Sequence, residues 1–254
     1  MLNKVMKYHF NYDPTAGPKQ KKKKKAKVDS GLVLWFAISQ WIHQGFTYLD
    51  RTEMFYRVWW ELIPDAIFFA LFYSTGLMSF WPSLILALFV VHTLNWVFNF
   101  NFWTGIDFSI PNFRNMGNDR TKEYLRGVQS RMKNANCIGA CTLYGSLSRA
   151  VWGEKSDLDM RIIRRPGLLN GFKGYWVTFR ERVIAVWYLN PMDLYMADGP
   201  KFLTRLRNDE FPVFLKLEDQ RIYDFYDGNG LELKEVDFDK VGHLNELGHP
   251  VQKQ

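Results

Sequence analysis

The chain contains no Asp, Glu, Lys or Arg from Ala66 to Phe102. A soluble pair of helices needs a charged outer face, and this stretch has none. A membrane span needs about 17–25 apolar residues. The arm on each side of Trp81-Pro82-Ser83 is only just long enough to meet the lower limit of that range. The pattern therefore predicts a transmembrane helical hairpin that turns at Pro82, with a re-entrant hairpin as the alternative.

The segment before this hairpin is apolar but interrupted. Between Gly31 and Leu49, Trp35, Trp41 and aliphatic residues alternate with a short polar side that includes His43. This pattern favours an interfacial helix with aromatic anchors, and an amphipathic core helix is the alternative. Further on, Pro64-Asp65 indicates a helix start, because proline and an acidic residue both suit the first turn of a helix.

A different pattern follows the hairpin, in which short apolar runs alternate with amphipathic helices. A charged helix is expected over 119–132, a short one from 145 to 151 or 152, and a longer one over 171–187. Strands are expected over 137–144, 158–163 and 191–196. Strands separated by helices indicate an α/β fold. We therefore divide the chain into a polybasic tail (1–30), a membrane-anchoring region (31–104), a linker (105–118), an α/β domain (119–230) and a C-terminal tail (231–254).

Composition adds two constraints. A hydrophobic content of 47% excludes a disordered chain, and a formal charge of +7 indicates an anionic partner. Much of that charge lies in Lys19–Lys27, which fits a nucleic-acid arm, a nuclear-import-like patch or a juxtamembrane anchor. The neighbouring hairpin favours the last, because anionic lipid attracts each nearby Lys by about 1 kcal/mol. With Arg114 and Arg120 on the other flank, the positive-inside rule places the domain and both termini in the cytoplasm. Cys137 and Cys141 have too few companion ligands for a zinc site.

Candidate chemistry lies in two short segments, Leu143–Arg149 and Ser156–Met160. Asp157 and Asp159 stand two residues apart at the start of an expected strand, so their side chains share a face. Two adjacent carboxylates repel each other unless a cation lies between them, and hard ions such as Mg²⁺ take oxygen ligands. The Gly145-Ser146 turn precedes a helix start, where backbone N–H groups hold phosphate. Together they predict a nucleotide-using site.

The stretch Gly145 to Asp159 resembles the signature of the DNA polymerase beta-like nucleotidyltransferase superfamily. It is most similar to the minimal nucleotidyltransferase branch, whose pattern runs Gly-Ser, a small residue, Arg, a spacer and Ser-Asp-x-Asp. The resemblance covers roughly residues 119–196 and implies a mixed sheet flanked by helices with a three-carboxylate metal site. Asp157 and Asp159 match the first two acids. Asp193, framed by apolar residues, matches the third, and the weaker alternatives in turn-like sequence are Asp198 and Asp209.

The resemblance also assigns roles around these acids. It implies nucleotide binding by Gly145, Ser146, Arg149 and Ser156. It implies two Mg²⁺ or Mn²⁺ ions, about 3.5–4 Å apart, that bridge the three carboxylates and the triphosphate. One ion would lower the pKa of an acceptor hydroxyl, whose proton Asp193 could take, and the other would stabilise the leaving pyrophosphate.

The leading hypothesis is a membrane-anchored nucleotidyltransferase that uses an NTP and an acceptor that is lipid-linked or a membrane protein. The alternative is a catalytically weak, nucleotide-binding regulatory protein that assembles a membrane complex. His92, Asn95 and Asn99 recur at helical spacing and predict helix–helix contact or homo-oligomerisation. A nucleic-acid enzyme ranks last, because no dedicated binding module is present. Basic residues that fit either phosphate binding or a solvated or lipid-facing surface are Arg161, Arg164, Arg165, Arg180, Arg182, Lys201, Arg205 and Arg207.

Overall fold

The computed structural model describes residues 30–44, 46–99, 115–149, 152–206, 210, 212–236 and 238. The polybasic run, most of the expected linker, Arg207 and Asp209 lie outside the described residues.

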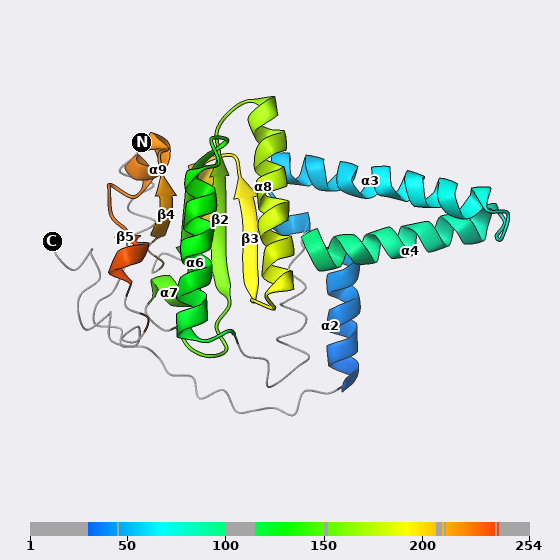
Figure 1. The fold of residues 1–254 in the computed structure, drawn as a ribbon, viewed down its shortest axis with the longest axis horizontal. Coiled ribbons are helices and arrows are strands. Elements are labelled where there is room, and N and C mark those ends of the chain that lie inside the picture. The colour runs from blue at the N-terminus through cyan, green and yellow to red at the C-terminus, as the bar shows by residue number, and fades with distance from the viewer. Residues whose placement is uncertain are drawn as a thin grey trace.

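A five-stranded mixed sheet forms the centre of the domain (Figure 1). Its order is β3-β2-β1-β4-β5; β1 is antiparallel to β2 and β4, whereas β2–β3 and β4–β5 are parallel. The expected mixed α/β sheet flanked by helices is confirmed. The expected domain end at residue 230 falls just before β5, which pairs with β4. The strands are β1 Ile138–Tyr144, β2 Leu158–Arg164, β3 Met192–Ala197, β4 Val213–Leu217 and β5 Leu231–Glu232.

Different helices pack on the two faces of the sheet. Helices α6 (Asn118–Lys133) and α8 (Leu168–Trp187) pack on one face, where Met160 and Ile162 of β2 point into the main core. The opposite face carries η2 (Pro200–Arg205) and α9 (Gln220–Phe225) over a second core. Since side chains alternate along a strand, Asp159 and Arg161 project on this second face, away from α6 and α8.

Two long helices project from the sheet as an antiparallel pair, α3 (Arg51–Ser74) and α4 (Phe80–Asn99) (Figure 1). They follow α2 (Ser30–His43) and η1 (Phe46–Tyr48). The chain reverses over residues 75–79, so the predicted turn at Pro82 is wrong: Pro82 lies in the first turn of α4. There proline breaks no intrahelical hydrogen bond.

The helix start predicted at Pro64-Asp65 is also wrong. Helix α3 begins at Arg51, where the Asp50 carboxylate accepts the Arg51 N–H at 2.8 Å, and continues through Pro64. Proline inside a helix costs about 3 kcal/mol, so packing against α4 and α8 must offset that cost.

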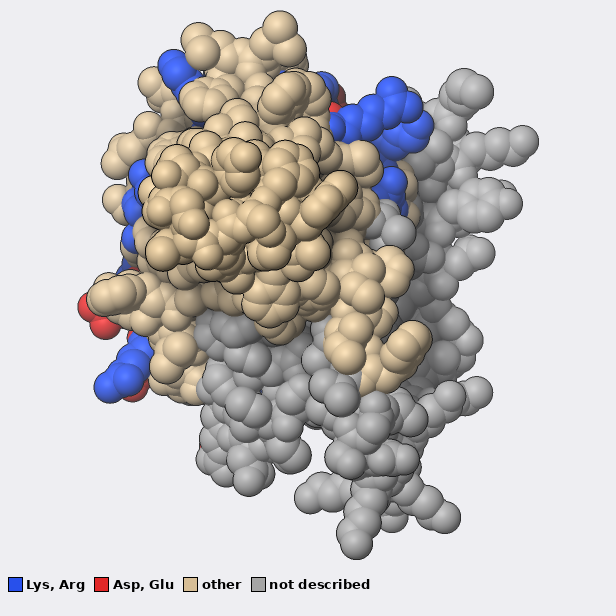
Figure 2. Space-filling view, turned by 90° about the vertical axis from the view of Figure 1, so that its right-hand side faces the viewer, with Lys and Arg blue, Asp and Glu red and all other residues tan. Residues whose placement is uncertain are grey.

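The far end of this helix pair presents no charge. Figure 2 views the molecule towards the tip of the projection, and basic and acidic side chains appear only around its margin. Among the described helices, α4 alone is long and apolar enough to cross a membrane, by length and composition. The exposed large side chains of α4, of the second half of α3 and of the turn between them are apolar and include Ile67, Leu71, Leu77, Trp81, Ile85 and Phe89.

The base of the pair is held to the sheet by buried polar groups. The Glu53 carboxylate accepts the backbone N–H of Met196 at 2.7 Å, and the Asp50 carboxylate accepts that of Asp198 at 2.8 Å. The Met196 N–H lies on the outer edge of β3 and the Asp198 N–H just after its end, so the two acids cover what would otherwise be an open sheet edge. Glu53 also pairs with Arg57 and Arg182, and all three side chains are buried.

The three polar residues of α4 have partners inside the chain. His92 bonds to Glu61 of α3 and to a carbonyl of α2. Asn95 donates to the Glu61 carboxylate at 3.0 Å, and Asn99 bonds to Tyr175 of α8. Their helical spacing therefore serves helix–helix contact within one molecule.

Candidate carboxylate site

The site is organised by the turn between β1 and α7 (Gly145–Ser148). Gly145 has φ +69°, a left-handed conformation that favours glycine. A Cβ atom on Gly145 would lie 1.8 Å from Oδ2 of Asp159. The turn thus places its backbone directly against this carboxylate, and no residue with a side chain fits there without moving it. Helix α7 ends at Ser148, short of the predicted 151 or 152.

Asp159 and Asp193 face the same side of the sheet. They are register partners across the parallel strands β2 and β3, so their side chains are neighbours. Asp157 lies just before β2 and is exposed. Of the alternative third acids, Asp198 is engaged in an ion pair of 2.5 Å with Arg164. The structure therefore brings Asp193 rather than Asp198 to Asp159.

The charges of the three acids act on one another. Burial, followed by the negative charges of Asp157 and Asp193, raises the pKa of Asp159 to about 8, while Arg161 acts in the opposite direction. Asp159 therefore holds a proton at neutral pH when no cation is bound. A bound cation would favour the charged carboxylate.

Arg161 is the direct partner of Asp193. Its guanidinium donates to Oδ2 of Asp193 at 3.1 Å and to the Asp193 carbonyl at 2.8 Å, and it stacks 4.9 Å from the centre of the Tyr195 ring. Sequence reasoning named Arg161 only as one of several basic residues. No local pattern reveals the pairing, because it crosses between strands.

The remaining motif residues line the turn. Nε of Arg149 donates to the Gly145 carbonyl at 3.1 Å and lies 3.4 Å from Glu210, which sequence reasoning did not identify. Ser156 accepts the Gly153 N–H at 3.0 Å and so shapes the loop before β2. In the described part of the chain the Ser146 hydroxyl is buried and has no hydrogen-bond partner.

Several of the other basic residues have structural roles. Arg182 bonds to Asn99 and to the Leu194 carbonyl, inside the base of the helix pair. Arg164 pairs with Asp198, and Arg165 pairs with Glu218 at the surface. These arginines support the fold and do not point to a phosphate site.

The oxygen atoms near the turn are of the kind that bind a divalent cation. Asp159 and Asp193 offer hard oxygen ligands side by side, and the unpartnered Ser146 hydroxyl lies on the adjoining turn. Within the described residues, no group of three or more His, Cys, Asp or Glu side chains is arranged to hold a metal ion. Asp157 would have to close on the pair to complete a three-carboxylate site.

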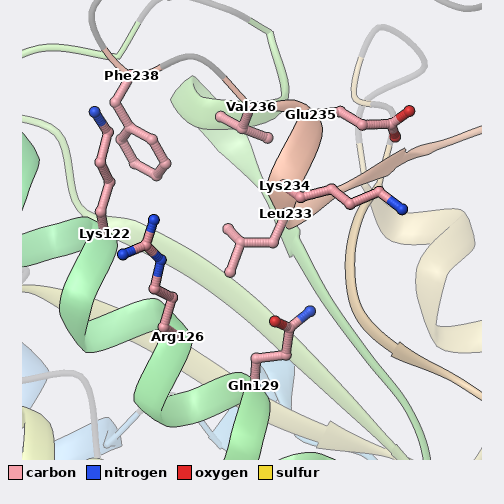
Figure 3. Close-up of a pocket in the computed structure, with 8 residues that line it drawn as sticks. All are labelled: Lys122, Arg126, Gln129, Leu233, Lys234, Glu235, Val236 and Phe238. Atoms are coloured by element: carbon pink, nitrogen blue, oxygen red, sulfur yellow. The ribbon is translucent and has the colours of Figure 1, made fainter.

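A separate cavity of about 450 Å³ lies between α6 and η3 (Leu233–Glu235) (Figure 3). Lys122 and Arg126 extend from α6 towards Phe238, and the Lys122 Nζ lies 5.6 Å from the centre of the Phe238 ring. Leu233 and Phe238 belong to the core on the α6 face of the sheet, opposite to Asp159. This cavity is therefore not part of the carboxylate site.

Comparison with family models, with curated proteins and with solved structures finds no match to this chain.

Proposed function

We propose that the chain is a membrane-anchored nucleotidyltransferase, which moves a nucleoside monophosphate from an NTP to an acceptor hydroxyl or phosphate and releases pyrophosphate. The observation that carries the proposal is the opposition of Asp159 and Asp193 in register, with the Gly145 backbone against the first carboxylate. This arrangement occurs at the spacing of the Gly-Ser to Asp-x-Asp signature. Burial and the neighbouring acids disfavour a charged Asp159, and a bound cation would relieve that cost in place of the proton.

The residues then divide into three roles. Asp157, Asp159 and Asp193 would hold Mg²⁺ or Mn²⁺, and the bound ions supply charge neutralisation and a more acidic acceptor hydroxyl. The Ser146 hydroxyl on the turn is buried without a hydrogen-bond partner and would have to turn outwards to reach the phosphates. Arg161 holds Asp193 in place through two hydrogen bonds. Catalysis in this scheme rests on positioning and charge, and requires no protein nucleophile.

The membrane part of the proposal rests on the helix pair. The far end of the pair has a charge-free, apolar surface, which would be costly to expose to water and favourable in lipid. Helix α4 has 20 residues, which at 1.5 Å per residue corresponds to about 30 Å. We propose that the pair inserts in the bilayer with the domain on the cytoplasmic side, so that the acceptor is a lipid-linked molecule or a membrane protein.

The decisive experiment measures pyrophosphate release by the purified full chain with each NTP and Mg²⁺ or Mn²⁺. Asp159→Asn and Asp193→Asn should each abolish release, whereas Asp224→Asn, an exposed acid on α9, should leave it unchanged. Release that persists unaltered in both site variants would refute the assignment.

One observation favours a second candidate, the nucleotide-binding regulatory protein. Asp193 is engaged by Arg161, and this pairing competes with metal binding at that carboxylate. Equilibrium binding of an NTP without any pyrophosphate release, tested over roughly pH 6–9 around the raised pKa of Asp159, would support this candidate.

A further inference from the structure

The outer face of α8 combines aromatic and basic side chains. Helix α8 packs against both members of the helix pair and lies across their base (Figure 1). Residues three, four and seven positions apart lie on one side of a helix. At that spacing α8 exposes a single stripe, formed by Leu169, Phe172, Lys173, Trp176, Arg180 and Trp187.

A cavity of about 460 Å³ lies beside this stripe, between α8 and the end of α6. Its polar lining comes from Arg131, Asn134, Lys173 and Arg180. Arg131 and Arg180 both bond to the buried Glu181, at 2.8 and 3.0 Å, so three cations face one anion. Among the described residues Lys173 has no hydrogen bond or ion pair. The cavity therefore keeps a net positive charge.

The apolar lining of this cavity is continuous with the helix pair. Phe172 packs on Tyr56 of α3 with ring centres 5.9 Å apart, and Trp176 packs on Trp60 with ring centres 5.7 Å apart. These contacts lie where the projecting pair leaves the domain. Aromatic residues of this kind collect at the boundary between bilayer and water, with basic side chains reaching the headgroups.

We propose that this cavity binds the phosphate headgroup of an anionic phospholipid, with Lys173 and Arg180 on the phosphate and with Phe172 and Trp176 against the lipid below it. The inference rests on the membrane anchoring of the proposed function and names the lipid class that the anchor selects. An RNA backbone would also suit cations and aromatic rings. The continuity of the rings with the charge-free projection favours lipid.

The test uses the full chain in neutral detergent micelles, titrated with phosphatidylglycerol or with phosphatidylcholine, and native mass spectrometry counts the bound lipid. The variant is Lys173→Gln with Arg180→Gln. The matched control is Lys122→Gln with Arg126→Gln, which removes the same charge from the cavity beside η3. Each basic residue near an anionic lipid contributes about fivefold in affinity, so the variant should bind phosphatidylglycerol about 30-fold more weakly and the control should not change.

Lys173→Gln alone should weaken phosphatidylglycerol about fivefold, and it removes no interaction of Glu181. Equal affinity for the two lipids, equal loss in both double variants, or displacement of the lipid by inorganic phosphate or RNA would overturn the inference. A wash of cell membranes in alkaline carbonate distinguishes failure of the membrane anchoring from failure of the headgroup site. Release of the chain there would overturn the anchoring and the inference together, whereas retention without a preference for phosphatidylglycerol would overturn the inference alone.

Discussion

Replacing Gly145 with alanine should lower both the stability of the fold and the proposed activity, because the new side chain would collide with the Asp159 carboxylate. The added Cβ would stand 1.8 Å from Oδ2 of Asp159 and 2.8 Å from its Cγ, well inside the 3.4 Å at which ordinary contact begins. The left-handed conformation at φ +69° adds a second cost, because it disfavours any residue with a Cβ.

The magnitude follows from these two costs. The left-handed backbone costs alanine about 1–2 kcal/mol, and forced overpacking costs about 1–3 kcal/mol. The sum, about 3 kcal/mol, corresponds to a fall of roughly 6–12 °C in the unfolding midpoint of a chain of this size. In the proposed transferase, displacing the Asp159 carboxylate by 1 Å should lower pyrophosphate release by about 100-fold.

The assay is thermal unfolding in mild detergent, combined with pyrophosphate release, for four proteins of a double-mutant cycle. The cycle contains the wild type, Gly145→Ala, Asp159→Ala and the double variant. Asp159→Ala removes the two closest atoms and leaves only a Cβ at 3.1 Å from the added one. In that background Gly145→Ala should therefore cost little beyond the backbone strain of about 1–2 kcal/mol. Gly153→Ala is the control, because its Cβ would meet nothing within 4 Å. Equal cost of Gly145→Ala in both backgrounds would refute the reasoning.

Three further predictions concern the site, the base of the helix pair and its orientation. In the presence of a chelator, the raised pKa of Asp159 means that the folded chain binds more protons than the unfolded chain between pH 4 and 8. The unfolding midpoint should therefore fall as the pH rises through that window, and Asp159→Asn should flatten this dependence. Glu53→Gln should cost about 3–5 kcal/mol in thermal unfolding, because two buried arginines lose their counter-charge, whereas Glu123→Gln on the exposed side of α6 should cost almost nothing. In cells, an impermeant maleimide should label Ser79→Cys without permeabilisation and Lys155→Cys only after it, since the turn and the domain are proposed to lie on opposite sides of the membrane.

Contrary outcomes are equally specific. A midpoint that rises between pH 4 and 8, with no change in Asp159→Asn, would contradict the shared carboxylate environment. A neutral Glu53→Gln would show that the arginines do not depend on it. Labelling of Ser79→Cys and Lys155→Cys from the same side would replace the spanning pair with a re-entrant one. The native thiols are Cys137 and Cys141, and both are buried.

Local pattern was sufficient where the chain follows its own periodicity. The alternation around Asp157 and Asp159 predicted β2, and the apolar frame of Asp193 predicted β3. Their register partnership needs the crossover through α8, which no local pattern specifies. Strand β4 was missed because Lys216 interrupts its apolar run. In the structure this lysine is buried, and its ammonium donates to the Ala135 carbonyl at 3.1 Å.

The proline rule fails at Pro64, which predicts a helix start but lies inside α3. Pro82 predicts the turn itself but lies within the first turn of α4, where proline is tolerated. The long contact between these two helices decides their extent, and sequence-local rules do not include it. Glu210 and Arg161 were likewise beyond prediction as site residues, because each acquires its partner only through the folded sheet.

The carboxylates of Asp50 and Glu53 on the margin of β3 have a practical consequence. A chain trimmed to begin after the projecting helices would lose both acceptors and leave Arg182 without its acid. The exposed β3 edges of two such trimmed molecules would be free to pair with each other through their backbone N–H groups, which is a route to aggregation. In the full chain these contacts join the helix pair directly to the sheet. If the pair inserts in a bilayer as proposed, the distance from the carboxylates to the lipid surface is set by folding and not by the length of a tether.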